Sequence, residues 1–285
     1  MNQPGWNPVA DLQQMWALPF MVNAYRAGTV LAVLAGLVGF LMVTRRQAFA
    51  GHTLSAVGFP GAAGATWLGV PAALGYFGFC VAAALTIAAA PSSARLRFSE
   101  ENALVGTVQA FALACGYLFV VLYHGVLGGT TALLFGSFLG VTAGQVTTLA
   151  VLAVVLLAVL AAIGRPLLFA SLDPQAARAS GVPVRALDVV FLVLLAATAA
   201  EVVQITGALM VFTLLVLPPA AARELTCRPA AGLALSVVLA LLVTWVALGV
   251  AYYSPYPIGF WLSSIAFGTF LLARATRAVR DRVPA

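Results

Sequence analysis

The chain has 285 residues, of which 63% are hydrophobic and only 8% are charged. A soluble domain of this size could not bury so much apolar side chain in one core, so the composition excludes a soluble protein and predicts an integral membrane protein. The net charge of +6 comes from 14 arginines and no lysine. These arginines lie between apolar runs and do not cluster on one face. This spacing indicates topology signals and no nucleic-acid partner.

The sequence lacks a phosphate-binding loop and a cysteine-based metal or redox motif. Without lysine the chain has no phosphate-binding G-x-x-x-x-G-K-[ST] loop, so we expect no ATP hydrolysis by this chain itself. Cys80, Cys115 and Cys227 fall in or beside different apolar runs, without C-x-x-C or zinc-type histidine spacing, and are expected to be thiols. The first 18 residues lack the basic start and apolar core of a cleavable signal peptide.

Apolar runs follow one another along most of the chain. A bilayer core is about 30 Å thick and needs roughly 20 apolar residues per helix, which predicts about eight or nine spans. The run that ends at Pro218-Pro219 is short, so the count is open by one or two. We predict an all-α, polytopic helical bundle in which residues 1–285 form a single domain. The runs are 21–43, 52–70, 72–90, 102–123, 145–164, 187–206, 207–222, 230–252 and 256–273.

Arginines predict the orientation, because basic residues in short loops stay on the cytoplasmic side. With nine spans, Arg26 alone falls on the opposite side. The N-terminus is then outside and the C-terminus inside, and Tyr252, Tyr253 and Tyr256 suit an external aromatic belt. The arginines on the inner side are Arg45, Arg46, Arg95, Arg97, Arg165, Arg178, Arg185, Arg223, Arg228, Arg274, Arg277, Arg280 and Arg282.

Small residues and glycines mark two further features. Gly28, Ala32 and Gly36 repeat every four residues, as do Gly61 and Ala65, which predicts close helix packing. Residues 124–145, "HGVLGGTTALLFGSFLGVTAGQ", have an apolar centre too short to cross a bilayer. They predict a short external helix or a re-entrant hairpin.

The stretch "SLDPQAARASGVP", residues 171–183, is unusually polar for this chain. Asp173 can cap a helix whose first residue is Pro174, and Gly181 followed by Pro183 can end it. Two helical turns are not stable alone in water, so the bundle or a partner must hold them. The residues alone leave two interpretations open, a capped connector or a docking element.

Several segments resemble permease subunits of the zinc, manganese and iron importers of the ATP-binding-cassette (ABC) superfamily. The resemblance runs in order from about residue 20 to residue 275. It is carried by "AGTVLAVLAGLVGFLMVTRRQAFAGHTLSAVGFPG", "SEENALVGTVQAFALACG", "LLFGSFLGVT", "RPLLFASLDPQAARASGVPV" and "QITGALMVFTLLVLPPAAAR".

The resemblance implies a type II ABC importer permease in the bacterial cytoplasmic membrane. Two copies would form the path for a divalent metal ion, zinc or manganese with iron as a third candidate, and no permanent cofactor is implied. Two separate ABC ATPase subunits would dock beneath, and an extracytoplasmic metal-binding protein would deliver the ion. The coupling segment would span 171–185, with the helix residues Asp173, Gln175, Ala176, Ala177, Arg178, Ser180 and Gly181.

The first candidate metal ligands depart from the family pattern. The G-D-x-x-S-H-x-x-x-P-G signature of the family places an Asp and a His four residues apart, but here His52 and Ala56 stand at those positions while Ser55 is kept. His52 then either contacts passing metal alone or is a hydrogen-bonded structural residue. His124, at the predicted external end of the fourth span, is either an entry ligand or an interfacial residue.

Glu201 and Gln204 are the other candidates. An ionisable group inside an apolar span is costly unless it faces a partner or a wet cavity. They lie three positions apart in the sequence, so they share a helix face. A cation pathway and hydrogen bonding between helices explain them equally well.

Other functions compete with the importer permease. A permease for a metal chelate, such as a siderophore or cobalamin, usually has a longer chain and about ten spans. A stand-alone secondary transporter or channel should show more charges within the membrane or an inverted repeat. A purely structural membrane protein would not need Glu201 or the capped polar stretch. No H-E-x-x-H or paired-carboxylate site supports an enzyme.

Overall fold

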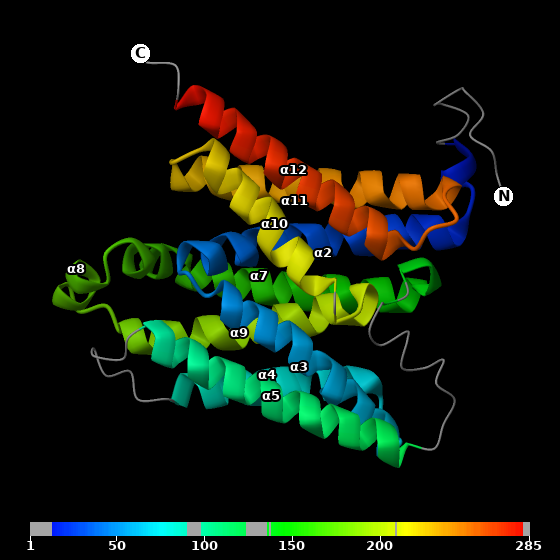
Figure 1. Cartoon of the computed structure of the whole chain (residues 1–285), viewed down its shortest axis with the longest axis horizontal. Coiled ribbons are helices and arrows are strands. Elements are labelled where there is room, and N and C mark those ends of the chain that lie inside the picture. The colour runs from blue at the N-terminus through cyan, green and yellow to red at the C-terminus, as the bar shows by residue number, and fades with distance from the viewer. Residues whose placement is uncertain (1–12, 90–97, 124–135, 137, 209, 282–285) are drawn as a thin grey trace. The chain divides into compact units, whose positions relative to one another are not determined.

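A computed structural model describes residues 13–89, 98–123, 136, 138–208 and 210–281 (Figure 1). Every regular element in that part of the chain is helical, which confirms the all-α prediction. The elements are α2 (Pro19–Thr44), α3 (Ala48–Trp67), α4 (Ala72–Ala89), α5 (Phe98–Leu122), the 3-10 turn η1 (Phe138–Gly140), α7 (Ala143–Leu172), α8 (Pro174–Ala179), α9 (Val184–Thr206), α10 (Val211–Leu225), α11 (Pro229–Tyr253) and α12 (Ile258–Arg280).

Each predicted apolar run corresponds to a helix, but fewer of these helices than predicted meet the requirements of a span. Among the described helices, seven are long and apolar enough to cross a membrane: α2, α4, α5, α7, α9, α11 and α12. The prediction of eight or nine is therefore too high by this measure. α10 has only 15 residues, about 22 Å at 1.5 Å per residue. α3 contains glycine, histidine, serine and threonine, and most of its residues are buried against protein.

The helices fall into two compact units. Unit 1 comprises Met1–Phe40, Ser137–Ala153 and Thr213–Ala285, and unit 2 comprises Leu41–Gly136 and Val154–Phe212. The long helices α2 and α7 each begin in unit 1 and end in unit 2, so both units are built from segments distant in sequence.

Unit 2 is built around α3, which packs against α4, α5 and α9 (Figure 1). The α3 and α4 backbones touch at Gly61 and Gly75, where a Cβ on either residue would run into the carbonyl of the other. Next to this crossing, a Cβ on Gly75 would lie 2.7 Å from the Cβ of Ala65. The predicted close packing of Gly61 and Ala65 is therefore confirmed.

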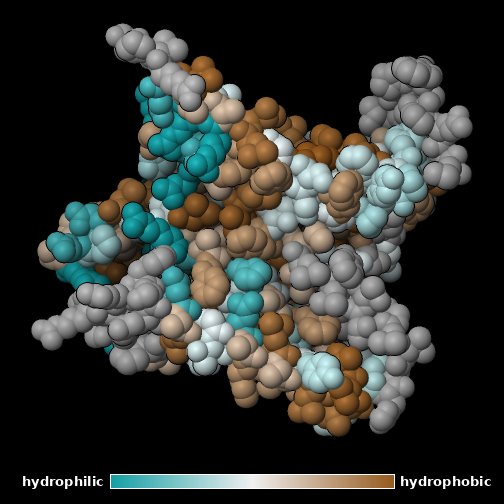
Figure 2. Space-filling model, viewed as in Figure 1, coloured by the Kyte–Doolittle hydropathy of each residue, from teal (hydrophilic) through white to brown (hydrophobic). Residues whose placement is uncertain are grey.

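Unit 1 joins α2 to α11 in the same way. A Cβ on Gly36 would lie 2.9 Å from the Cα of Val237, and the Ser236 hydroxyl donates to the Gly36 carbonyl at 2.7 Å. One more hydrogen bond, 3.0 Å long, runs from the Trp245 indole N–H to the hydroxyl of Thr29. α12 packs on α11, and hydrophilic side chains gather over the C-terminal end of α12 (Figure 2).

The double proline lies inside α10, and the helix continues through it. Pro219 has no N–H to donate to the carbonyl of Leu215, four residues earlier. Gly39 of α2 packs directly on that carbonyl, where a Cβ would clash. Gly39 thus allows α2 to approach α10 closely at the Leu215 carbonyl, to which Pro219 cannot donate.

Candidate functional site

The polar stretch at 171–183 forms the short helix α8 between α7 and α9. The Asp173 carboxylate accepts hydrogen bonds from the N–H groups of Gln175 (3.1 Å) and Ala176 (2.9 Å), and proline occupies the first turn. Gly181 ends the helix with a φ of 79°, a left-handed conformation that favours glycine. The predicted cap and the predicted stop are both confirmed, and the helix begins at Pro174 as predicted.

α8 packs on α9 with one face and leaves the other open. Ala177 is fully buried, whereas Gln175, Arg178 and Ser180 are exposed. Hydrophilic side chains gather over this helix (Figure 2). The buried face holds a helix that would not be stable alone, and the outer face is available to another molecule.

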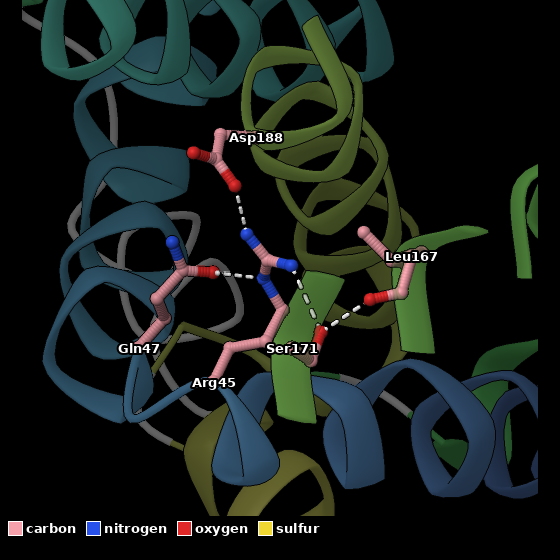
Figure 3. Close-up of polar contacts among 5 residues, drawn as sticks. All are labelled: Arg45, Gln47, Leu167, Ser171 and Asp188. Atoms are coloured by element: carbon pink, nitrogen blue, oxygen red, sulfur yellow. Dashed lines mark hydrogen bonds and ion pairs between the residues drawn. The ribbon is translucent and has the colours of Figure 1, made fainter. Parts of the chain in front are cut away.

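Arg45 contacts both of the chain segments that flank α8 (Figure 3). It follows α2 directly, and its guanidinium forms an ion pair with Asp188, near the start of α9. It also donates to the Ser171 hydroxyl at 2.9 Å, in the last turn of α7, and to the Gln47 side chain at 3.3 Å, just before α3. Its Cζ lies 5.1 Å from the ring centroid of Phe191.

These contacts tie α8 to the rest of unit 2. Ser171 lies two residues before the cap of α8, and Asp188 lies seven residues after Gly181. One side chain, only 8% exposed, thus holds the chain entering α8 and the chain leaving it. Through Arg45, the segment that enters α8 is therefore connected to the beginnings of both α3 and α9.

The candidate metal ligands lie on α3 and α9, two helices that pack against each other. His52 is half-buried, and its ring meets the ring of Phe212 edge to face, with centroids 5.0 Å apart. The Ser55 hydroxyl donates to the Gly51 carbonyl of its own helix at 2.8 Å, and the Gln204 amide donates to the Ala200 carbonyl at 3.3 Å. His124 lies outside the described residues.

Glu201 differs from the other candidates. Its side chain is fully buried, and neither carboxylate oxygen has a hydrogen-bond partner. The Thr198 hydroxyl, one turn earlier on α9, is also fully buried and has no partner. In the part of the chain that the structure describes, no three histidine, cysteine, aspartate or glutamate side chains gather as a metal cage would require.

Comparison with known families decides the identity of the chain. A family model described as the ABC 3 transport family matches residues 17–277. The chain belongs to the ABC 3 transport family. This membership confirms the resemblance to importer permeases that the sequence motifs carry.

Individual ABC 3 relatives are similar over most of their length. The manganese transport system membrane protein MntC of Halalkalibacterium halodurans is 25% identical over 215 residues, which cover 75% of this chain and 73% of that protein. The chelated iron transport system membrane protein YfeC of Yersinia pestis is 29% identical over 217 residues, covering 76% and 72%.

A solved structure supports the fold of this ABC 3 chain independently. The structure of PsaBC from Streptococcus pneumoniae in complex with Fab superposes with a TM-score of 0.82, at 22% identity, covering 93% of this chain and 94% of that one. At 22% identity, this similarity supports the fold alone.

Sequence reasoning missed the Arg45 cluster in this ABC 3 permease fold. From the sequence, Arg45 was predicted only to be a topology signal, Ser171 was only the first residue of the polar stretch, and Asp188 and Thr198 had no predicted role. One sign was present in the sequence: Asp188 is a lone carboxylate close to the start of an apolar run, where such a group needs a partner. The identity of that partner, 143 residues away, could not be read from spacing.

Proposed function

We propose that this chain is the membrane-spanning permease subunit of an ATP-driven importer of a divalent metal ion. The observation that carries the proposal is the family match over residues 17–277, in a chain whose described part has seven helices suited to cross a membrane. A stand-alone secondary transporter gains no support from these findings.

The proposed cargo is based on the names of the relatives. Its relatives are named as transport proteins for manganese and for chelated iron, so we propose manganese or iron as cargo, with zinc as the third candidate. The metal is substrate rather than resident cofactor. His52, Ser55, His124, Glu201 and Gln204 are the proposed contacts along its path.

ATP would be hydrolysed by a separate subunit that docks on α8. The absence of lysine, and hence of a phosphate-binding loop, supports this division of labour. The exposed face of α8 offers a surface, and the contacts of Arg45 on both sides of α8 offer a mechanical connection from it to α3 and α9. We propose two permease copies, two ATPase subunits and an extracytoplasmic metal-binding protein as the complete importer.

We propose that the importer lies in the bacterial cytoplasmic membrane. Arginine-rich connections support a permease N-terminus outside and a C-terminus inside. α8, which follows one such connection and contains Arg178, would then face the cytoplasm, where ATP is available.

The test is co-purification of the ABC ATPase with the full-length permease, together with uptake of manganese, iron and zinc by vesicles that contain both. Arg178→Glu reverses a charge on the exposed face of α8 and leaves the cap at Asp173 and the buried Ala177 in place. Arg274→Glu is the matched control, because Arg274 is also exposed but lies in α12, outside the proposed coupling segment 171–185.

We expect Arg178→Glu to reduce ATPase recovery and uptake several-fold, and Arg274→Glu to leave both near the wild-type level. Replacement of residues 173–181 by a flexible Gly-Ser segment should abolish both. Association and uptake that survive this replacement would overturn docking through α8. A wild-type complex that takes up none of the three metals would overturn the cargo.

A further inference from the structure

Two polar side chains on α9 lie buried without any hydrogen-bond partner. Both carboxylate oxygens of Glu201 and the hydroxyl of Thr198 are unpaired, and both residues are 0% exposed. Buried polar groups in folded proteins nearly always have a partner, so an unpaired pair on adjacent turns calls for an explanation.

Glu201 is exceptional among the acidic residues whose side chains the structure describes. It lies five residues before the end of α9 and has neither solvent nor a partner. The other acidic side chains have partners: Asp173 the N–H groups of α8, Asp188 the guanidinium of Arg45, and Glu224 and Asp281 the guanidinium of Arg277. A carboxylate left in this state within a membrane helix is costly unless a positive charge joins it.

The direction of the two side chains follows from the packing of α9 on α3. Val203 of α9 lies against Gly58 of α3, where a Cβ would be 3.2 Å from its methyl carbons. Glu201 precedes Val203 by two residues, which turns it about 200° round the helix at 3.6 residues per turn. Thr198 is three residues before Glu201 and shares its side of the helix. The pair therefore points away from the side that packs on α3.

We propose that Glu201 and Thr198 are two ligands of a divalent cation that this permease carries, and that the site suits a hard cation such as Mn²⁺. This inference rests on the proposed metal transport and adds a position and a donor set to it. The turns from Leu194 to Ile205 contain no histidine, cysteine or methionine. Carboxylate and hydroxyl oxygens suit Mn²⁺, whereas imidazole and thiolate ligands favour Zn²⁺.

A site with few protein ligands fits a cation in transit. Small hard cations commonly keep several water ligands and bind through one or two carboxylates. A transport site must also bind weakly enough to release its ion. The absence of a three-residue cluster of histidine, cysteine or acidic side chains, within the described residues, agrees with such a site.

The alternative is an uncharged glutamic acid that serves packing alone. Removing its charge would lower the cost of burial but would still leave its oxygens and the Thr198 hydroxyl unpaired. The two explanations differ in whether Mn²⁺ binds and in how substitutions change that binding.

The experiment titrates the full-length chain in lipid nanodiscs with MnCl₂ alone and follows free Mn²⁺ by its EPR signal. We expect wild-type protein to bind Mn²⁺, and Glu201→Gln to bind it about 10-fold more weakly or worse, as loss of a metal ligand should produce. Thr198→Val should weaken binding about 2- to 10-fold, and Thr198→Ser, which keeps the hydroxyl, should not.

Two control substitutions and one substitution that changes the metal preference complete the experiment. Glu224→Gln removes a partly exposed carboxylate that is paired with Arg277, and Thr244→Val removes a buried hydroxyl that donates to the Ala240 carbonyl of its own helix. Neither should change Mn²⁺ affinity. Glu201→His places a nitrogen ligand at the site, and the affinity for Zn²⁺ relative to Mn²⁺ should rise about 10-fold.

Equal Mn²⁺ affinity of wild type and Glu201→Gln would overturn the site, as would wild-type protein that binds no Mn²⁺. If Glu201→Gln does not fold, the comparison of Thr198→Val with Thr198→Ser decides. Metal uptake by the wild-type complex, measured separately, distinguishes the two proposals. Uptake with Mn²⁺ binding that is insensitive to these substitutions overturns the site alone, whereas no uptake of any metal overturns the transport function.

Discussion

Arg45 offers the sharpest test of the packing in unit 2. Arg45→Met keeps an unbranched side chain of similar length but removes the guanidinium. The variant loses the ion pair with Asp188, the hydrogen bonds to Ser171 and Gln47, and the contact with the Phe191 ring. We expect the free energy of unfolding to fall.

The size of the loss depends on how well water can replace the guanidinium. Arg45 is 8% exposed, but Asp188 is 40% exposed and stays partly hydrated after the substitution. Exposed ion pairs contribute about 0–1 kcal/mol, and breaking a fully buried pair costs about 3–5 kcal/mol. An intermediate value of about 2 kcal/mol follows for Arg45→Met. Asp188→Asn should cost about 1–2 kcal/mol, because the guanidinium keeps its bonds to Ser171 and Gln47.

A double-mutant cycle isolates the ion pair. Unfolding of the full-length chain by denaturing detergent gives free energies for Arg45→Met, Asp188→Asn and the double variant, and we expect an interaction energy of about 1 kcal/mol. Arg46→Met is the matched control: Arg46 is exposed, so this change should stay within about 0.5 kcal/mol of wild type. Single effects that simply add, within about 0.3 kcal/mol, would refute the pairing.

Two further substitutions test other parts of unit 2. Gly61→Ala places a methyl group against the α4 backbone at Gly75 and should cost about 1–3 kcal/mol of unfolding free energy. Gly78→Ala, on α4 with open space around it, is the control and should not destabilise the chain. Asp173→Ala removes the cap of α8 and should cost about 1 kcal/mol of helix stability. Faster amide hydrogen exchange over α8 would show this loss, and Asp173→Asn, which still caps, should exchange nearly as slowly as wild type.

Local signals carried most of what could be predicted about the fold. Asp173, Pro174 and Gly181 marked the ends of α8 because capping, a fixed φ and a left-handed turn depend on neighbouring residues alone. Apolar runs located the long helices for a similar reason, since lipid demands apolar residues along the whole length of a span.

Predictions failed or fell short where a residue's surroundings decide. α3 resembles a span in length, but its glycines and polar residues lie against α4, α5 and α9, so it does not need the apolar surface of a lipid-facing helix. Glu201 was found as a charged residue in an apolar run. Its lack of any partner could only come from the structure.

Arg45 shows why a residue with one sufficient explanation can still have a second role. The positive-inside rule accounts for an arginine at this position, so sequence reasoning had no cause to look further. That rule needs only the charge and is satisfied equally by Arg46, which is exposed. The contacts of Arg45 need a planar guanidinium with several N–H donors, which a lysine would not supply. Arg45→Lys should therefore leave the orientation of the chain unchanged and still loosen the connection between α8 and the helices α3 and α9.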